Sequence, residues 1–424
     1  MKRSIAILLA LAALAAGFVW GFAAERYRIF PRPWIRRGAV LLGRRWSHTA
    51  DLNSTSPPLA ALKSIPYLSG SVDPRPQDMG VLVNERERVA PGVNFFSTLW
   101  RGDAFLVDGE GRRLWRWSLS RELSSVEMRP GIAFGFTHLY PNGDVLAFVD
   151  GFGVLKLDKD SRLLWKHVAL AHHDAFVADD GTIYALAHER RPVPAICERY
   201  PSLLDDVLVL SASGERVRTI SIFDAIERSP YAFLLPRTEG LKLGADTEVV
   251  DVLHTNHVEV YDGRLAHLSP LFRRGNLLVS MRSLNAIAIL DGTTSQVLWL
   301  WGPTNLSLQH YPTILENGHV LLFDNGTRLS QVVEVDPRTN AVAWRYAPEK
   351  DFFSASRGAC QRLPNGNTLI TLSEGGRAIE VTASGRTVWE YANPSVAAGG
   401  VRENIFQMTR VPAASLTFLG SSPP

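Results

Sequence analysis

From Gly80 onward, short runs of alternating apolar and polar residues are separated by tight-turn dipeptides. An Asn-Gly or Asp-Gly pair precedes a strand-like run at Asn142–Leu146, Asp180–Tyr184, Asn317–Leu321 and Asn365–Leu369. These dipeptides supply the positive φ angles that tight hairpins need. The pattern therefore predicts a series of antiparallel β-hairpins over this part of the chain.

A second and a third strand complete each repeat. The second ends in an Asp or a small turn, as at Val332–Asp336. The third carries a tryptophan, as at Trp115, Trp165, Trp299, Trp344 and Trp389. Matching phrases recur roughly every 40–50 residues, which is the period of propeller blades. Five copies are clear, and the longer segment 187–249 has room for a sixth.

The repeat also predicts how the blades pack and close. We expect the tryptophans to anchor one blade against the next rather than to stack on a ligand. Propellers usually close by joining both ends of the chain in one blade. We therefore expect Gly80–Val83 to pair with the segment that ends near Ile405–Pro412, so that the propeller spans residues 80–412 and residues 413–424 form a C-terminal tail.

The N-terminal segment is different in character. Residues 4–24 are almost wholly apolar and long enough to span a bilayer. We favour an uncleaved transmembrane anchor over residues 1–24, and the alternative is a signal peptide cleaved after Ala23-Ala24. Residues 25–79 are interpreted as a linker with one short helix around Leu59–Ile65. Arginines after the apolar run would, by the positive-inside rule alone, leave the body in the cytoplasm.

Composition narrows the classes of function. Hydrophobic residues make up 46% and charged residues 21% of the chain, as in a globular protein with a full core. A formal net charge of +3 argues against nucleic-acid binding. Cys197 and Cys360 either pair or are two buried thiols. No C-x-x-C or H-E-x-x-H spacing is present, so we expect no metal site, and we expect no cofactor. A quinone-dependent dehydrogenase is a distant alternative, because the motifs it needs are not evident.

Polar side chains gather at predicted strand ends between Asp251 and Arg328. Such groups are costly to bury, and they usually converge on water, a ligand or each other. In a strand, His254 and Asn256 would share one face and His257 the other. Arg282, which follows the strand-like run 277–281, is either an anion clamp or an inter-blade ion pair. The remaining candidates in the chain are Gln309, His310, Asn325, Arg328, His138 and His172.

Several phrases of this region resemble the bacterial arylsulfate sulfotransferase (arylsulfotransferase) family. They are L-H-T-N-H at Leu253–His257, R-R-G-N-L-L-V-S-M-R at Arg273–Arg282, Q-H at Gln309-His310, N-G-H-V-L-L-F-D-N-G at Asn317–Gly326 and L-P-N-G-N-T-L-I at Leu363–Ile370. The phrases G-R-A-I-E-V and V-W-E-Y-A-N-P, which end at Val381 and Pro394, extend the resemblance.

The resemblance implies an all-β, six-bladed β-propeller in the periplasm. Together with the transmembrane helix expected from the apolar N-terminal run, it predicts a propeller held at the inner membrane. It implies transfer of sulfuryl from a phenolic sulfate ester to a phenol acceptor through a histidine, without a nucleotide. The implied catalytic residues are His254, His310 and Arg328. The residues expected to bind the anion or substrate are Asn256, Arg282, Gln309, Asn325, His172 and His138. The sequence departs from the family in one place, since residues 352–361 lack the late histidine that the family carries there.

Two functions therefore stand side by side at this point. The first is a membrane-anchored sulfuryl transferase, which His254, His310 and Arg328 favour. The second is a catalytically degenerate propeller that binds a protein or polysaccharide partner, which the missing late histidine favours. The fold alone does not separate them, because propellers serve many functions.

Overall fold

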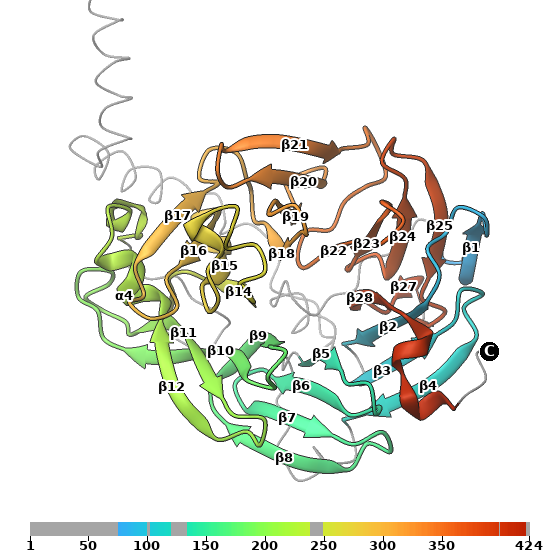
Figure 1. Ribbon diagram of the computed structural model, residues 1–424, viewed down its shortest axis with the longest axis horizontal. Helices are drawn as coiled ribbons and strands as arrows, with labels where there is room; N and C mark the ends of the chain where they lie inside the picture. Colours follow the sequence, from blue (N-terminus) through green and yellow to red (C-terminus); the bar gives the residue numbers. More distant parts are fainter. Residues whose placement is uncertain (1–74, 100–101, 120–133, 238–248, 398, 421–424) are drawn as a thin grey trace, which may run out of the picture. The chain divides into compact units, whose positions relative to one another are not determined.

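The alternating runs fold into antiparallel strands, as the turn chemistry predicts. The computed structural model describes residues 75–99, 102–119, 134–237, 249–397 and 399–420, all within one compact unit. Their strands form six blades around a common axis, with one inner strand of each blade nearest that axis (Figure 1). The all-β propeller and its six blades are thus confirmed. The segments 1–24 and 59–65 lie outside the described residues.

Each blade has four main strands, which run in order from the axis outward. Blade 1 contains β28 (Ile405–Val411), β2 (Val93–Thr98), β3 (Asp103–Val107) and β4 (Arg113–Ser118). Blade 2 contains β5 (Phe134–Leu139), β6 (Val145–Val149), β7 (Gly153–Leu157) and β8 (Leu163–Val168). Blade 3 contains β9 (Ala171–Val177), β10 (Ile183–Arg191), β11 (Ser202–Leu210) and β12 (Arg216–Ser221).

The other three blades follow the same order. Blade 4 contains β14 (Thr255–Val260), β15 (Leu277–Met281), β16 (Ala286–Leu290) and β17 (Val297–Trp301). Blade 5 contains β18 (His310–Ile314), β19 (Val320–Asp324), β20 (Gln331–Asp336) and β21 (Ala341–Tyr346). Blade 6 contains β22 (Ala359–Arg362), β23 (Thr368–Leu372), β24 (Arg377–Val381), β25 (Thr387–Ala392) and, outermost, β1 (Gly80–Asn84).

Short elements lie between the blades, within blade 4 and after β28. They are the helix α4 (Ile222–Glu227), the strand β13 (Val250–Asp251), the hairpin of β26 (Val396–Ala397) and β27 (Val401–Arg402), and the 3-10 turns η3 (Ala232–Leu234), η4 (Pro270–Phe272), η5 (Arg282–Leu284), η6 (Ala413–Ser415) and η7 (Thr417–Leu419). None of the helices among the described residues combines the length and apolar character needed to cross a membrane.

The second strand of a blade is buried on both faces, which explains its unbroken apolar sequence. In β6, Val145 and Ala147 pack into the core between blades 1 and 2, whereas Leu146 packs into the core between blades 2 and 3. In β19, Val320 faces blade 4 and Leu321 faces blade 6. Because successive side chains point to opposite faces of a strand, one strand supplies two cores. A core of this kind lies between each pair of neighbouring blades and holds the ring together.

The outer-strand tryptophans have the packing role that the repeat predicts. The indole N–H of each of four tryptophans donates a hydrogen bond to the outer turn of the next blade. The pairs are Trp115 with Lys159 O (2.8 Å), Trp299 with Asn340 Oδ1 (2.8 Å), Trp344 with Ala383 O (2.9 Å) and Trp389 with Gly109 O (2.9 Å). The same contact recurs between four pairs of neighbouring blades, so these side chains help to fix how the blades pack against each other.

The expected pairing at ring closure is wrong in detail. The N-terminal strand β1 pairs with β25 in blade 6, whereas the C-terminal strand β28 pairs with β2 in blade 1. Each end of the chain thus completes a different blade. The chain therefore crosses the interface between blades 6 and 1 twice. At the N-terminal end it passes from β1 in blade 6 to β2 in blade 1, and at the C-terminal end from β25 in blade 6 to β28 in blade 1.

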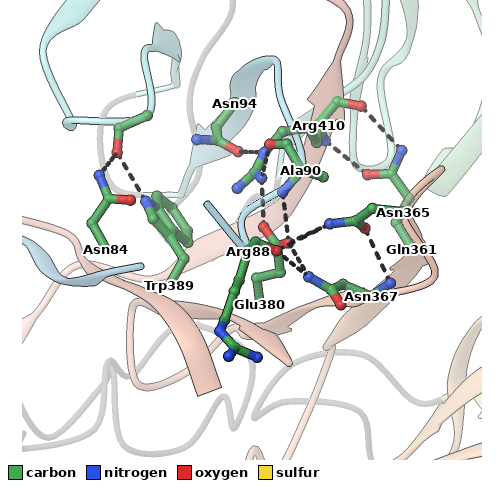
Figure 2. Close-up of polar contacts among 11 residues, drawn as sticks. Asn84, Arg88, Ala90, Asn94, Gln361, Asn365, Asn367, Glu380, Trp389 and Arg410 are labelled. Carbon is green, nitrogen blue, oxygen red and sulfur yellow. Dashed lines mark hydrogen bonds and ion pairs between the residues drawn. The ribbon is translucent and has the colours of Figure 1, made fainter. Parts of the chain in front are cut away.

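A buried ion pair spans this interface (Figure 2). Arg410 Nη1 lies 2.6 Å from Glu380 Oε2, and the two side chains are 3% and 0% exposed. The other carboxylate oxygen, Oε1, accepts hydrogen bonds from the Ala90 N–H (2.8 Å) and from Asn367 Nδ2 (2.7 Å). Arg410 Nε donates to Asn94 Oδ1 at 2.8 Å. One carboxylate therefore ties the segment between β1 and β2, blade 6 and β28 together.

The structure also bears on three further expectations, which concern the long segment 187–249, the two cysteines and the C-terminal tail. The long segment 187–249 does hold the rest of a blade, namely the end of β10 with β11 and β12. Cys197 and Cys360 are both free and buried, so they do not pair. In the segment predicted as a tail, the Phe418 ring packs edge-on against Trp115, with ring centroids 5.2 Å apart.

Candidate functional site

A small cavity lies on the axis, where inner strands of blades 3, 4, 5, 6 and 1 meet. Its lining is mostly polar and comes from strand segments far apart in the sequence. The lining residues are His173, Asp174, Asn256, His310, Tyr311, Arg357, Gly358, Phe406 and Gln407. Its volume is about 20 Å³, which accommodates roughly one water molecule. A larger ligand therefore enters only if lining side chains move.

The backbone is strained at the rim of this cavity. His173, His254, Tyr311 and Arg357 all have positive φ angles, of 55°, 50°, 51° and 55°. They lie on the inner strands of blades 3, 4, 5 and 6 or within two residues before them. Left-handed conformations of non-glycine residues cost about 1–3 kcal/mol each and concentrate at functional sites. His254 also differs from the sequence prediction. It lies just before β14 in a left-handed conformation, and so it does not share a strand face with Asn256.

His310 is a neutral histidine with both ring nitrogens engaged. Nδ1 lies 2.7 Å from Asn325 Oδ1 and 2.9 Å from the Leu308 carbonyl oxygen, so Nδ1 carries the proton. Nε2 accepts a hydrogen bond from the Arg357 backbone N–H at 3.2 Å. Burial, and then the charge of Arg282, lower the pKa of His310 to about 3. His310 therefore positions the Arg357 segment and does not supply a proton at neutral pH.

Asn325 connects the same parts from the other side. Its Nδ2 donates to the carbonyl oxygens of Ser354 and Arg357, both at 2.7 Å. The side chain is fully buried. Asn325 thus orients both His310 and the 354–357 segment, and through them it places Arg357 at the cavity.

His254 is paired with a carboxylate three residues earlier. Its Nδ1 forms a very short hydrogen bond with Asp251 Oδ2, and its backbone N–H donates to Asp251 Oδ1 at 3.0 Å. Burial opposes ionisation of Asp251, but the charge of His254 and its hydrogen bonds lower the pKa of Asp251 below the ordinary value. An ionised Asp251 holds the proton of His254 on Nδ1, which leaves the lone pair on Nε2. The His254 ring packs edge-on against His173, which lines the cavity, with centroids 4.7 Å apart.

Arg282 supplies a positive charge that no carboxylate balances among the described residues. It directly follows β15, as expected, and its backbone N–H donates to the His254 carbonyl oxygen at 3.2 Å. Within the same part of the chain its guanidinium forms no ion pair, and its buried Nε makes no hydrogen bond. Of the two roles considered for Arg282, the inter-blade ion pair is therefore not found where the structure describes the chain. Arg282 is half-buried, its main chain contacts His254 and its charge acts on His310, so its guanidinium is suited to bind an anion.

Asn256 and Gln309 join blades 4 and 5 beside the cavity. Asn256 Nδ2 donates to the Gln309 carbonyl oxygen at 2.8 Å, and Gln309 Nε2 donates to Ser280 Oγ at 3.1 Å and the Ala286 carbonyl oxygen at 2.9 Å. In the described part of the chain, Asn256 Oδ1 and Gln309 Oε1 are buried without hydrogen bonds. Of these two residues, Asn256 lines the cavity and Gln309 supports it from behind.

The remaining predicted residues lie elsewhere. Arg328 is exposed in the loop after β19, so the structure does not bring it to the cavity. His138 packs against Tyr140, with centroids 4.5 Å apart, and burial lowers its pKa to about 4. His172 is buried one residue before the lining residue His173. Arg328 lies away from the cavity because its position depends on the direction of the loop after β19, which the sequence pattern does not specify.

Sequence reasoning missed other residues of the site. Arg357 lines the cavity from within the segment 352–361, so an arginine occupies the place where the resemblance implied a histidine. Asp251 was visible three residues before His254 but was not assigned a role. Asp150, which follows β6, interacts electrostatically with His188, His254 and Arg357, and burial raises its pKa. Nothing in the local sequence around Asp150 marks it.

Taken together, these features define a six-bladed β-propeller with a histidine- and arginine-containing polar site on its axis. The model of the family described as Arylsulfotransferase (ASST) matches residues 138–394, more than half of the sequence. The chain therefore belongs to the arylsulfotransferase family. No curated protein sequence matches the chain.

Solved structures show only general similarity. A protein of unknown function from Bacteroides caccae is 14% identical, with 75% of this chain and 98% of that chain covered and a TM-score of 0.49. BamB from Moraxella catarrhalis is 14% identical, with coverage of 75% and 77% and a TM-score of 0.33. A streptogramin B lyase structure is 11% identical, with coverage of 76% and 84% and a TM-score of 0.43. At these values they carry no argument about function.

Proposed function

We propose that this protein transfers a sulfuryl group from a phenolic sulfate ester to a phenol, with His254 as the group that carries the sulfuryl. Membership of the arylsulfotransferase family supports the reaction class. The observation that carries the assignment to this site is Arg282, whose guanidinium has no carboxylate partner among the described residues and whose backbone N–H donates to the carbonyl oxygen of His254, the partner of Asp251. An aryl sulfate is a monoanion whose oxygens suit arginine donors.

In the first step, His254 Nε2 attacks sulfur. An N–S bond forms, the ester S–O bond breaks, and the phenolate leaves with the electron pair of that bond. Asp251 stabilises the positive charge that develops on the imidazole, as a carboxylate does for a catalytic histidine. In the second step, a phenol oxygen forms a new S–O bond while the N–S bond breaks, and the electron pair returns to Nε2. The proton of the phenol O–H passes to the group that protonated the first phenolate, which restores the starting protonation state.

Arg282 and Arg357 would hold the sulfuryl oxygens through both steps. Preorganised cationic donors aimed at developing charge are usually the largest contribution to this kind of catalysis. The leaving phenolate must also gain a proton. Asp150 is the candidate donor, since burial raises its pKa, which favours its protonated form, and it interacts electrostatically with His254 and Arg357. His310 is excluded by its pKa of about 3.

The test is release of nitrophenol from p-nitrophenyl sulfate in the presence of phenol, followed by absorbance. We expect release that depends on the phenol acceptor and that falls at least about 1,000-fold in His254→Gln, as expected when a nucleophile is removed. His138→Gln is the matched control and should keep full activity, because His138 lies outside the cavity lining. Equal activity of His254→Gln and the wild type would overturn the assignment, and an inactive wild type would favour a non-catalytic binding propeller.

We propose further that residues 4–24 anchor the protein in the inner membrane with the propeller in the periplasm. The apolar length of that segment supports an anchor, and the family resemblance supports the periplasm. Fractionation of cells followed by protease treatment of spheroplasts tests this proposal. Propeller recovered intact from protease-treated spheroplasts would place it in the cytoplasm instead.

A further inference from the structure

A second polar cluster lies on blade 3, next to the axial site but not part of the cavity lining. It consists of His172 on β9, His188 on β10 and Asp205 on β11. His188 and Asp205 are direct partners in the strand register, and His172 comes from the neighbouring strand. One donor atom from each residue lies within 4.8 Å of the others. The three side chains are only 15% exposed or less.

The hydrogen bonds within this cluster leave one donor atom unused. Asp205 Oδ1 lies 2.8 Å from His188 Nδ1, and Asp205 Oδ2 accepts the Thr255 backbone N–H at 2.6 Å. His172 Nε2, in contrast, lies 3.7 Å from Asp205 Oδ1 and is buried without a hydrogen bond among the described residues. A buried polar atom left without a partner typically costs about 1–3 kcal/mol. Such an atom is expected to have a ligand.

The protonation states fit a metal ligand set. Burial, and then the nearby His188 and His254, hold the pKa of His172 well below its ordinary value, so its imidazole is neutral. A neutral imidazole is the form that coordinates metals. His172 Nδ1 lies 2.9 Å from His173 Nδ1, and Asp205 is held by Thr255, so two of the three residues already have the supporting contacts that orient metal ligands.

We propose that His172, His188 and Asp205 bind a divalent first-row transition metal ion, for which Zn²⁺ is the best-matched probe. Two imidazoles and one carboxylate suit these ions, whereas Ca²⁺ prefers six to eight oxygen ligands. Three protein ligands leave at least one coordination position open. The expectation of no metal site rested on the absence of ligand motifs with short sequence spacing. These three ligands come from three different strands, so no such motif could reveal them.

Binding requires two changes in the cluster. The His172 and His188 rings are stacked, with centroids 3.7 Å and planes 11° apart, so one ring must rotate before both lone pairs point to one ion. In addition, the ion must replace the proton that His188 Nδ1 shares with Asp205. Burial lowers the pKa of His188, but the hydrogen bond and charge of Asp205 raise it above its ordinary value overall. Protons and the metal ion therefore compete for His188, so Zn²⁺ affinity should fall as the pH is lowered.

The experiment is equilibrium dialysis of the purified full-length protein against Zn²⁺ at two pH values, followed by metal analysis. We expect one tightly bound Zn²⁺ per chain, weaker binding at the lower pH, and no comparable binding of Ca²⁺. His172→Ala and, separately, His188→Ala should weaken binding at least about tenfold. His267→Ala, which changes an exposed histidine, is the matched control and should bind as the wild type does.

Circular dichroism of each variant separates loss of the site from loss of the fold. The proposal fails if the wild type binds no Zn²⁺, if folded His172→Ala and His188→Ala both bind as tightly as the wild type, or if Ca²⁺ binds equally well. Because the readout is metal content, it does not depend on sulfuryl transfer. The metal proposal and the proposed function can therefore fail independently.

Discussion

The carboxylate that closes the ring offers the sharpest test of how this fold is held together. Substituting Glu380→Gln keeps the shape of the side chain but removes its charge and places an amide N–H where a second acceptor oxygen was. Arg410 would then be left buried without a counter-ion, and one of the donors on Ala90, Asn367 or Arg410 would lose its acceptor. Breaking a buried ion pair by removing one partner costs about 3–5 kcal/mol, and we expect a loss of that size.

The matched control is the same substitution at an exposed ion pair between the end of β1 and the β24–β25 turn of blade 6. Glu85 lies 2.6 Å from Arg386, but the two side chains are 31% and 58% exposed. Exposed ion pairs contribute about 0–1 kcal/mol, so Glu85→Gln should change the free energy of unfolding by no more than that. The two variants differ in burial and not in the chemistry of the change.

Urea unfolding followed by fluorescence of the blade tryptophans measures both variants. We expect a lower midpoint for Glu380→Gln at an unchanged slope, which identifies a change in stability. Adding Arg410→Met to Glu380→Gln should recover part of the loss, because no buried charge then remains unpaired. The reasoning is refuted if Glu380→Gln loses no more stability than Glu85→Gln, or if the double variant is as unstable as the two single losses added together.

Three more outcomes follow from the site. Arg282→Gln should lower kcat/KM for an aryl sulfate by roughly 10–100-fold, the worth of a charged hydrogen bond, while Arg328→Gln leaves it unchanged; equal effects in steady-state assays would contradict the placement of these residues. Asn325→Ala should cost about 2–3 kcal/mol in urea unfolding, because three buried partners lose their hydrogen bonds; an unchanged midpoint would show that Asn325 does not hold the 354–357 segment. Burial raises the pKa of Glu259 from 4.5 to about 7, so the folded protein binds this proton more tightly than the unfolded chain. The stability it contributes is complete below pH 4.5 and is lost as the pH rises through 7, by on the order of 3 kcal/mol. Glu259→Gln should flatten that part of the stability profile between about pH 5 and pH 8, and an identical profile would contradict the shift.

The sequence identified many residues of the candidate site by their type and by their position near predicted strand ends, but it did not predict their contacts. His254, Asn256, Arg282, His310 and Asn325 were candidates on those grounds, and the structure brings them together near the axis. Their roles were not visible, since the hydrogen bond from the Arg357 N–H to His310 Nε2 joins residues on different blades. A contact of that kind depends on how two inner strands meet, and no local pattern encodes it.

Local sequence is sufficient to specify the blades. Alternation of side chains and Asn-Gly turns act over a few residues, so they specify hairpins wherever they occur, and the tryptophan of each repeat provides the contact to its neighbour. What lies at the axis depends instead on the packing of the blades. That packing brings Arg357 to the cavity instead of Arg328, pairs His188 with Asp205 beside His172, and closes the ring through Glu380 and Arg410. These contacts join strands distant in the sequence, so their geometry is defined only when all six blades pack together.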